Sequence, residues 1–504
     1  MTRVRVPVVG NFLTRNSTYL VDNTDKDQHF INCYPESVYN PETQQKRLYV
    51  KNRPGTKFYA TSTGISPPQN TSGGLTYWEA TNKLYAASGY TLYAQSGSVL
   101  NGINTDSSSS NTRSGFAAYK EGTVDKLFFC NGTNAYIINT SNTVVDVTDA
   151  DFPSPHIPTP VVMDGYVFIA TSKHIYNSKL EDASSWDPTN FITPEQYTDS
   201  IVTIARQLNQ IVAFGTKSIE FFYNAGNATG SPLKRTDQAV LQVGAYDWQS
   251  IASAENLIMF VARNNSGNLT IGALENMRLT TVSTEPIERR LNEYMIRQSD
   301  LNANHTINMY GNFIHADGHM FYVLYIKQDR AGGSPKTYTD TFVYDVTEKL
   351  WSEWELDPIR TCEKNGVTYL QKSDYVTIYQ MNSMYMKDDI TPVPGAGDPT
   401  STPITMTVQT ALMDLGSSVR KFLSKLYIVG DWSKNESNTT TPLEVSWSDD
   451  DYTTWSTSRT IQLGIRSYLT QLGAFRRRAF KLVSTLVAPV RIEFLELEVD
   501  EGEN

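Results

Sequence analysis

Residues 209–224 read NQIVAFGTKSIEFFYN and contain two apolar runs separated by a short polar segment. The run at 211–214 precedes the segment at 215–218, and a Phe- and Tyr-rich run follows at 219–223. β-Branched and aromatic residues favour strands, whereas glycine and small polar residues favour a tight turn. This stretch therefore predicts an antiparallel hairpin. An isolated hairpin buries too little surface to be stable in water, so a chain that repeats it is expected to stack the copies.

The same pattern recurs between about residues 75 and 385. Equivalent positions in successive repeats are separated by 43, 40, 44 and 46 residues and are occupied by Leu84, Leu127, Val167, Ile211 and Leu257. A period in the low forties with several strands in each unit is typical of β-propeller blades. We therefore predict an all-β chain with a propeller of six or seven blades over residues 66–385.

The segments outside this repeat predict a second, smaller β domain. Prolines interrupt residues 1–65, which we interpret as an N-terminal arm that contributes to a platform. Residues 386–403 are rich in proline and glycine and are predicted to be a linker, with the Asp388-Asp389 pair on a solvated loop. Residues 404–504 return to alternating strands and predict a small β-sandwich or barrel platform, built by the terminal regions together.

One insertion in the repeat has a helical pattern. Ile287, Leu291 and Tyr294 fall on one helical face, and Pro286 suits an early helical position. We predict a short helix at about 286–297.

Composition and charge exclude several classes of protein. The chain has 504 residues, 39% of them hydrophobic and 19% charged, and a formal net charge of −10. This acidic balance argues against a general nucleic-acid binder, which needs clustered lysine and arginine.

Cys33, Cys130 and Cys362 lie far apart and indicate neither a disulfide framework nor a CxxC metal site. The N-terminus lacks the hydrophobic region of a signal peptide, and no run is long enough to span a bilayer, which fits synthesis in a reducing cytoplasm.

Motifs that could carry chemistry are few. Residues 448–455, SDDDYTTW, resemble an Asp-box hairpin, in which Asp450 accepts bonds within its own turn and Trp455 packs beneath it. The sequence from His315 to His319 contains possible metal ligands, but its Asp-Gly pair predicts a hairpin turn more simply. The chain contains no G-x-S-x-G, P-loop, G-x-G-x-x-G or HExxH motif. We therefore predict no catalytic residue, no metal and no cofactor.

One dense basic cluster stands out in this acidic chain. Its candidate interface or partner-docking residues are Arg476, Arg477, Arg478 and Lys481. Two interpretations remain open: the cluster forms salt bridges between subunits, or it docks a partner protein or DNA. Acidic residues that could serve the first interpretation are Glu493, Glu496 and Glu498.

Several segments, taken in order, resemble a known family. They are INCYPE at 31–36, RPGTKF at 53–58, IVAFGTKSIEFFYNAG at 211–226, TEPIERRLNEY at 284–294 and QLGAFRRRAFKLVSTLVAPVRIEFLELEV at 471–499. Together they resemble the packaged-DNA stabilisation protein, or tail hub (nozzle) protein, of short-tailed, podovirus-type bacteriophages. The resemblance covers most of the chain and is strongest in the central hairpin and the C-terminal segment.

The resemblance implies a structural virion protein without enzymatic activity, synthesised in the bacterial host cytoplasm. In this family a homohexameric tube lies below the portal and adaptor ring, retains packaged DNA and becomes the ejection channel. Tail fibres or spikes are further implied partners, double-stranded DNA passes through the lumen without tight binding, and no membrane insertion of its own is implied. The alternative is a glycan-active β-propeller enzyme of sialidase or glycoside-hydrolase type, for which we find no recognisable acid pair or arginine triad. A third possibility is a host-side propeller scaffold that binds proteins, which the phage-like termini disfavour.

Overall fold

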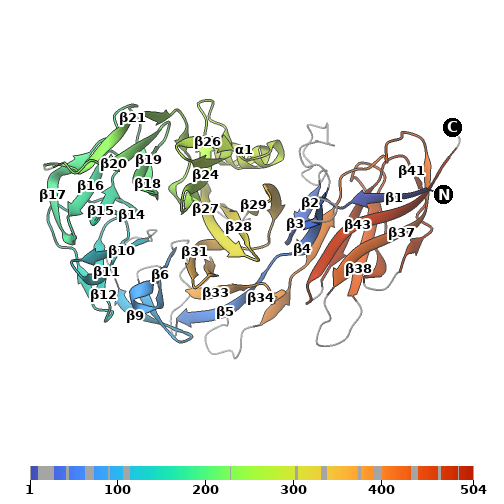
Figure 1. Ribbon diagram of the computed structural model, residues 1–504, viewed down its shortest axis with the longest axis horizontal. Coiled ribbons are helices and arrows are strands. Elements are labelled where there is room, and N and C mark those ends of the chain that lie inside the picture. Colours follow the sequence, from blue (N-terminus) through green and yellow to red (C-terminus); the bar gives the residue numbers. More distant parts are fainter. Residues whose placement is uncertain are drawn as a thin grey trace.

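Two β bodies lie side by side along the long axis of the computed structural model (Figure 1). One is a ring of blades and the other is a β domain that contains both ends of the chain, which we call the platform. The structure describes residues 2–9, 28–40, 45–62, 73–88, 91–105, 114–227, 229–300, 305–330, 338–372, 376–390, 400–432, 441–463, 467–485 and 487–502.

The ring is a propeller whose described strands form seven blades, which confirms the predicted fold class. Blade 1 contains β6 (Gly73–Trp78), β7 (Lys83–Ser88), β8 (Thr91–Ser96) and β9 (Val99–Thr105). Blade 2 contains β10 (Gly115–Glu121), β11 (Val124–Cys130), β12 (Ala135–Asn139) and β13 (Val144–Asp146). Blade 3 contains β14 (Ile157–Met163), β15 (Tyr166–Ala170), β16 (Ile175–Lys179) and β17 (Asp182–Ile192). Blade 4 contains β18 (Ile201–Gln207), β19 (Gln210–Gly215), β20 (Ile219–Asn224) and β21 (Leu233–Leu241).

The remaining blades depart from this regular spacing. Blade 5 contains β22 (Gly244–Ala245), β23 (Ala252–Ala254), β24 (Leu257–Arg263), β25 (Leu269–Glu275) and β26 (Arg278–Thr281). Blade 6 contains β27 (His305–Ala316), β28 (His319–Arg330), β29 (Tyr338–Asp345) and β30 (Leu350–Glu353). Blade 7 contains β31 (Pro358–Lys364), β32 (Val367–Lys372), β33 (Thr377–Asn382) and, as its outer strand, β5 (Gly55–Ser62). Short 3-10 turns occur at η2 (Glu79–Thr81) and η3 (Trp248–Ser250).

Closure of the ring depends on the N-terminal segment. The inner strands contact one another in the order β6, β10, β14, β18, β23, β27 and β31, and β31 returns to β6. β5 pairs antiparallel with β33 and parallel with β9, so it joins blade 7 to blade 1. The predicted arm at 1–65 therefore ends in a propeller strand, a long-range pairing that local sequence patterns do not contain.

The opening hairpin shows why both faces of a blade are apolar. In blade 4, Ile211 and Phe222 pack toward blade 3, whereas Phe214 and Phe221 pack toward blade 5. Side chains alternate along a strand, so a blade between two others buries both of its faces. The hairpin turn also needs Gly215, because a Cβ atom there would lie 2.3 Å from the Asp199 carboxylate. That carboxylate holds the turn by accepting bonds from the backbone N–H groups of residues 217 and 218.

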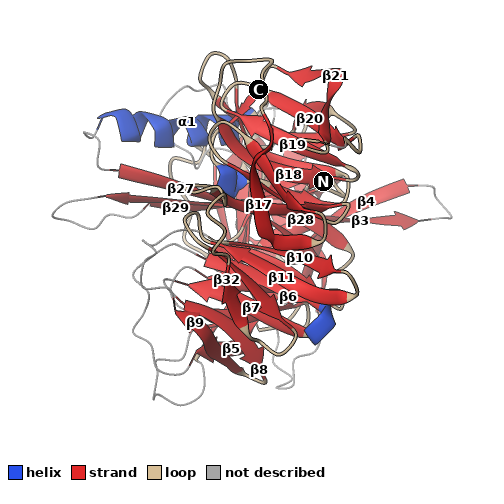
Figure 2. Cartoon of the chain, turned by 90° about the vertical axis from the view of Figure 1, so that its left-hand side faces the viewer, coloured by secondary structure: helices blue, strands red, loops and turns tan. Residues whose placement is uncertain are grey.

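The insertion between blades 5 and 6 is helical, with α1 (Glu285–Asp300) spanning the predicted range. Its buried face contains Ile287, Leu291 and Tyr294, which pack with strands of blades 5 and 6. Figure 2 shows that α1 and the long β27–β29 ribbon extend to one side of the propeller, whereas the β3–β4 hairpin extends to the other. No helix among the described residues is long and apolar enough to cross a membrane.

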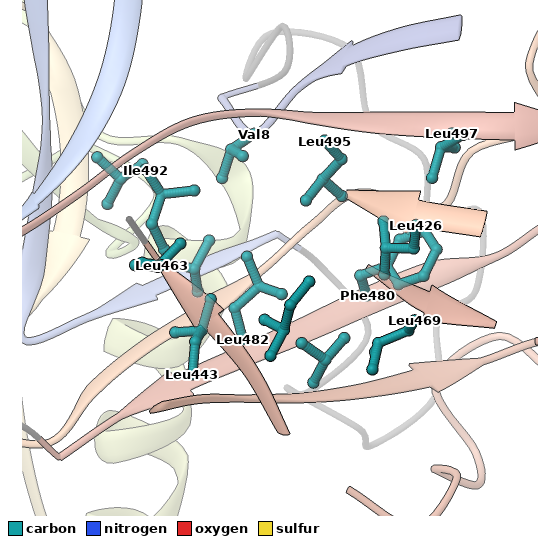
Figure 3. Close-up of a cluster of buried hydrophobic side chains, with 14 of the residues drawn as sticks. Val8, Leu426, Leu443, Leu463, Leu469, Phe480, Leu482, Ile492, Leu495 and Leu497 are labelled. Atoms are coloured by element: carbon teal, nitrogen blue, oxygen red, sulfur yellow. The ribbon is translucent and has the colours of Figure 1, made fainter. Parts of the chain in front are cut away.

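The platform consists of two sheets that enclose a common apolar core (Figure 3). The first sheet contains β1 (Thr2–Pro7), β3 (Cys33–Asn40), β4 (Gln45–Asn52), β37 (Lys421–Trp432), β40 (Leu469–Thr470), β41 (Ala474–Phe475) and β43 (Val490–Glu501). The second contains β2 (His29–Ile31), β36 (Met406–Gln409), β38 (Thr441–Ser448), β39 (Arg459–Leu463) and β42 (Ala479–Ser484). The core takes residues from both ends of the chain, among them Val8, Leu426, Phe480 and Leu495.

The second platform sheet is continuous with blade 6. β2 pairs in parallel with β30 through Ile31 and Glu353, and antiparallel with β36. The predicted linker at 386–403 also contains regular structure, since β34 (Lys387–Asp389) pairs with β35 (Ser401–Pro403) and with β5. The middle of that linker, 391–399, lies outside the described residues. The two bodies are thus connected by hydrogen-bonded strands and not only by a loop.

Candidate functional site

The axis of the propeller contains a cavity of about 1440 Å³. Six of the seven blades contribute to its lining, which includes Thr76, Gly115, Pro158, Ser253, Gly311 and Arg360. A concave site at which several elements converge is where a propeller enzyme would hold a substrate. This cavity is therefore the place to test the glycan-active alternative.

The acidic and basic side chains in the lining of this cavity are Glu255, Glu275, His315, Lys349, Arg360 and Glu363. Arg360 lies over the Trp248 ring, with its guanidinium carbon 5.6 Å from the ring centroid, and donates to its neighbour's carbonyl. His315 Nδ1 lies 3.0 Å from Glu363 Oε2, and both side chains are exposed. Among the described lining residues Arg360 is the single arginine, so the lining does not supply an arginine triad.

The His315–His319 segment forms the predicted hairpin between β27 and β28. Asp317 and Gly318 both have positive φ angles, 53° and 81°, which suit the two central positions of a tight hairpin turn. The two histidines point to different partners: His315 to Glu363, and the buried His319 to Asp345, with Nδ1 2.7 Å from Oδ2.

His319 is part of a polar contact between blade 6 and the platform. Its Nε2 lies 4.0 Å from Glu36 Oε1 of β3. The hydrogen bond to Asp345 and, after it, the nearby carboxylate of Glu36 raise the pKa of His319 to about 9, against the effect of burial. Nearby, Asp317 accepts hydrogen bonds from Lys51 Nζ at 2.6 Å and from the Tyr34 hydroxyl at 2.9 Å.

The three cysteines lack the properties of nucleophiles or metal ligands. All are free thiols, and burial raises the pKa of each, to about 12 for Cys362. A neutral thiol is a weak nucleophile and a weak ligand. In the described part of the chain, no three His, Cys, Asp or Glu side chains are grouped as metal ligands.

The Asp-box-like hairpin at 448–455 organises its own turn. Asp450 Oδ1 accepts hydrogen bonds from the Ser448 hydroxyl at 2.8 Å and from Thr454 N at 2.9 Å. These bonds, with that of the Thr454 hydroxyl first among them, lower the pKa of Asp450 to about 2. Tyr452, which stands where the Asp-box pattern has glycine, adopts φ of 64° and donates its buried hydroxyl to the Thr410 carbonyl. The hairpin lies in the platform, away from the propeller cavity.

The structure divides the basic cluster into three environments, of which the first is the exposed surface at Arg476 and Arg477. Arg478 is 1% exposed, donates from Nε and Nη2 to the two Asp449 carboxylate oxygens at 2.7 Å, and lies over the Trp447 and Phe475 rings. Lys481 lies on the other sheet, over the Trp455 ring. We therefore remove Arg478 from the candidate docking residues, because its charge is enclosed and paired. The run of three arginines in the sequence does not reveal this, since the exposed Arg476 and Arg477 lie in a bend and Arg478 follows them in a buried bridge with Met413.

The acidic residues considered as intersubunit partners already have partners within the chain. Glu498 accepts a 2.7 Å hydrogen bond from Arg3 and lies 3.3 Å from Lys425 Nζ. Glu496 lies 3.5 Å from Arg3, and Glu493 lies 3.2 Å from Arg491. The Arg3 contacts join β1 to β43, the Lys425 contact joins β37 to β43, and the Arg491–Glu493 pair lies within β43.

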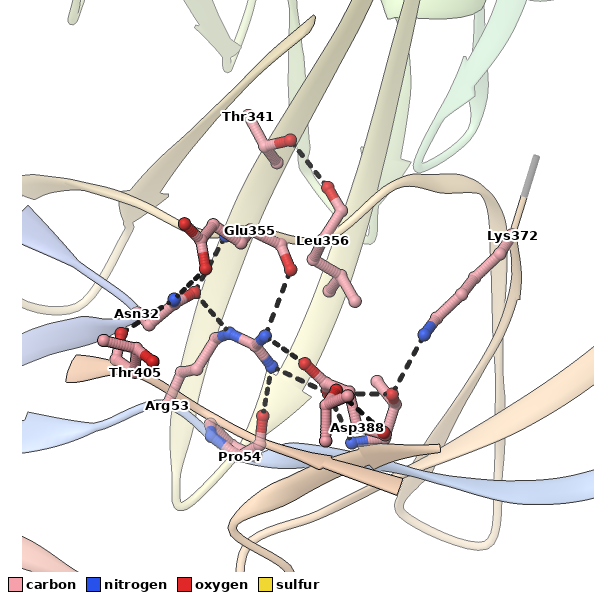
Figure 4. Close-up of polar contacts among 11 residues, drawn as sticks. Asn32, Arg53, Pro54, Thr341, Glu355, Leu356, Lys372, Asp388 and Thr405 are labelled. Atoms are coloured by element: carbon pink, nitrogen blue, oxygen red, sulfur yellow. Dashed lines mark hydrogen bonds and ion pairs between the residues drawn. The ribbon is translucent and has the colours of Figure 1, made fainter. Parts of the chain in front are cut away.

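A buried arginine at the junction of propeller and platform was missed by the sequence analysis (Figure 4). Arg53, 1% exposed, donates to Asn32 Oδ1 at 2.9 Å, to the Pro54 carbonyl at 3.0 Å and to the Glu355 carbonyl at 3.1 Å. It also donates to both carboxylate oxygens of Asp388. We call Arg53, Asn32, Glu355 and Asp388 the junction cluster.

The junction cluster corrects the prediction that Asp388-Asp389 lies on a solvated loop. Burial alone would raise the pKa of Asp388, but the charge and hydrogen bonds of Arg53 lower it. Asp389 is also buried and accepts a bond from Phe58 N at 2.7 Å. A sequence signal was present, because Asn32 and Arg53 belong to the two N-terminal segments that carry the resemblance, but their partners lie more than 300 residues away.

A second charged cluster supports the same junction. Arg290 of α1 pairs with Asp340 and Glu353, and His29 Nδ1 of β2 lies 3.3 Å from Glu353. Burial would raise the pKa of Glu353, but the His29 and Arg290 contacts lower it to about 2. Helix, blade and platform therefore meet at one carboxylate.

Comparison with solved structures finds matches of low sequence identity and low TM-score over about two thirds of the chain. The chain is similar to a streptogramin B lyase, with 12% identity over 70% of this chain and 98% of that one and a TM-score of 0.37. The corresponding values for virginiamycin B lyase from Staphylococcus aureus are 8%, 63%, 97% and 0.39, and those for the N-terminal domain of Nup159 are 9%, 71%, 99% and 0.37. No curated protein sequence matches the chain. At this similarity none of the solved structures bears on function.

Comparison with protein families finds one match that covers more than half of the chain. Residues 21–324 match the phage stabilisation family described as Bacteriophage P22 Gp10, beta-propeller. The matched range includes blades 1 to 5, α1 and most of the β27–β28 hairpin. The chain belongs to this family of phage β-propeller proteins.

Proposed function

We propose that this protein is the tail hub, or nozzle, of a short-tailed phage: a homohexameric tube below the portal and adaptor that retains packaged DNA and becomes the ejection channel. The observation that carries the proposal is the family match across the propeller. Tail fibres or spikes are proposed further partners in the virion.

The architecture suits a subunit of such a tube. A closed propeller is a rigid module with few free strand edges, and here it is fastened to a platform by a shared sheet and by the junction cluster. The platform contains both ends of the chain at one end of the molecule (Figure 1). A rigid module with a separate terminal domain can present one surface to neighbouring copies and another to the next ring of the tail.

Charge is consistent with a channel that does not retain DNA by adhesion. Six copies at −10 each would give a ring of about −60. A polyanion is repelled by such a surface unless lysine and arginine are concentrated along its path. We expect the purified protein to bind duplex DNA only weakly at physiological salt, measured by fluorescence anisotropy. Submicromolar binding that is independent of sequence would contradict a non-adhesive channel wall.

The assembly itself can be tested directly. Light scattering of the purified chain should give the mass of six copies, alone or after addition of portal and adaptor rings, and electron-microscopy class averages should show sixfold rings with a central opening. A chain that stays monomeric in both conditions would contradict the proposal.

The glycan-active alternative makes a different prediction. An enzyme of this kind would release the chromophore from a nitrophenyl sialoside or glycoside, and substitution Arg360→Ala in the axial cavity would abolish that activity. We expect no turnover by the wild-type chain.

A further inference from the structure

We propose that the end of the platform remote from the propeller docks an acidic segment of another protein. The site consists of Arg420, Phe422, Arg476 and Arg477, which we call the terminal arginine patch. Figure 1 shows β41, which immediately precedes two of these arginines, at the far end of the platform beside the C-terminus. The inference goes beyond the proposed tube and does not depend on ring formation.

A buried ammonium group holds the two loops that carry the patch. Lys421 is 1% exposed, and its Nζ donates to the carbonyls of Ser417, Val419 and Arg476. An ammonium group without a carboxylate partner in the interior needs such carbonyl contacts to offset its lost hydration. The contacts tie the segment before β37 to the segment after β41. The patch is therefore preorganised, which reduces the entropy lost on binding a partner.

The guanidinium groups presented by these loops are exposed and are not neutralised by a carboxylate of the described chain. The one hydrogen bond found for them joins Arg476 Nη1 to the Ser418 carbonyl at 2.9 Å. Arg420 lies over the ring of Phe422, with its guanidinium carbon 5.9 Å from the centroid. By contrast, Arg478, the next residue in the run, has both Asp449 oxygens as partners. Three arginines thus retain donors for an external acceptor.

The combination of arginine with an exposed aromatic ring indicates a protein partner. Phe422 is 49% exposed although it lies on a strand between Ala474 and Asp500. Arginine and aromatic residues are enriched at the energetic centres of protein interfaces. The matching surface would place carboxylates around an apolar side chain that covers the ring.

Duplex DNA fits the patch less well. Asp500 and Glu501 of β43 lie beside it and would repel a continuous line of phosphates. A DNA-binding surface needs an extended array of basic groups, whereas this patch has three arginines at one end of an acidic chain.

The test uses the full-length protein and two labelled probes. One probe is a fluorescein-labelled peptide of repeated Glu-Glu-Leu units, and the other is a labelled DNA duplex; both are titrated by anisotropy over a range of salt concentrations. The patch variant is Arg420→Gln with Arg476→Gln and Arg477→Gln. The matched control is Arg47→Gln with Arg278→Gln and Arg289→Gln, which removes the same charge from other exposed sites.

We expect the peptide to bind the wild-type protein and the control equally and to bind the patch variant at least about tenfold more weakly. Replacement of the three patch arginines by lysine should restore part of the affinity, because charge is kept while planar bidentate bonding and stacking are lost. Lys421→Met should weaken peptide binding without removing a surface charge, with circular dichroism verifying that the platform remains folded.

Three results would overturn the inference. They are equal loss of peptide binding in the patch variant and the control, binding of the duplex in preference to the peptide, and no peptide binding by the folded wild-type protein. None of these results bears on whether the chain forms a hexameric ring. Conversely, a chain that binds the peptide through the patch but stays monomeric would contradict the proposed tube and leave the docking site intact.

Discussion

The propeller and the platform are built from the same kind of strand but are assembled in different ways. A propeller blade such as blade 4 pairs strands that follow one another between Ile201 and Leu241. In the platform, by contrast, β1 pairs with β43, and Arg3 bonds Glu498 across 495 positions of sequence. The propeller is thus a series of local units, whereas the platform exists only when both ends of the chain meet.

The two regions also differ in what lies inside them. The facing surfaces of blades 3, 4 and 5 are filled mainly by aliphatic and aromatic side chains, with the carboxylate of Glu220 enclosed beside them and paired with Arg235. The platform and its junction with the propeller enclose charged groups as well, notably Arg53, Lys421 and Arg478. A buried charge adds little net stability, but removal of its partner is strongly destabilising. We infer that apolar burial stabilises the blades, whereas enclosed charges determine which distant segments pair in the platform.

Arg53→Met should have the largest effect, because it breaks the contact between the two regions. The variant removes the guanidinium donor from the carbonyls of Pro54 and Glu355 and from the Asp388 carboxylate, which keeps neutral donors from Thr56. Removal of one member of a buried pair costs about 3–5 kcal/mol. Calorimetry should then show platform and propeller unfolding in separate transitions.

Asp388→Asn is the matched variant for this contact. It keeps the size of the side chain and weakens the pair from the other partner, so the double variant should cost less than the sum of the two single changes. A single unfolding transition in Arg53→Met, at the wild-type temperature, would show that the shared sheet alone couples the two regions.

The same contrast explains what could be predicted from sequence. The period of the apolar hairpins identified the propeller because each blade is local, and the amphipathic pattern around Leu291 identified α1. The pairing of β5 with β33 and the junction cluster could not be predicted, since no local pattern states which distant segment supplies a partner. The run Arg476–Arg478 indicated a basic surface, but burial of its last member depends on contacts with the distant residues Asp449 and Met413.

Two neighbouring arginines within the platform provide the next test. Arg478→Met should destabilise the platform by about 2–3 kcal/mol. The cost is below that of a fully enclosed pair because the Asp449 carboxylate is partly exposed and can be hydrated when its partner is removed. Arg476→Gln should change stability by less than about 0.5 kcal/mol, as is usual for an exposed residue. Urea unfolding followed by the fluorescence of platform tryptophans would measure both. Equal effects of the two substitutions would contradict the assignment of one arginine to the interior and one to the surface.

The pair of His319 with Asp345 in blade 6, with Glu36 of the platform beside it, predicts a pH dependence of stability. The pKa of His319 is raised to about 9 in the folded protein, above its usual value of about 6.5, so the protonated form is the stabilised one. The contribution is therefore complete below about pH 6.5 and is lost as the pH rises through about 9. We expect a loss of about 1–2 kcal/mol over this interval, after allowance for solvent screening. Because tyrosines and lysines also begin to titrate there, the quantity to measure is the difference in unfolding free energy between wild type and His319→Gln, which should shrink toward high pH.

A smaller loss than that at His319 is expected at Asp450, because the Asp450 turn, like a propeller hairpin, is held by contacts within a short stretch of sequence. Asp450→Ala removes side-chain bonds that stay within the turn at 448–455, and for an exposed turn this should cost at most about 1 kcal/mol. Because the folded pKa of Asp450 is lowered to about 2, its contribution is present above about pH 4 and is lost only as the pH falls through about 2. Wild type and Asp450→Ala should therefore keep a constant difference in unfolding free energy from pH 8 to about pH 5. Asp450→Asn is the control, since an amide oxygen can still accept the Thr454 and Ser448 bonds. A loss of stability as large as that of Arg478→Met would mean that this turn, too, depends on distant parts of the platform. In that case the platform would contain no locally determined hairpin of the propeller kind.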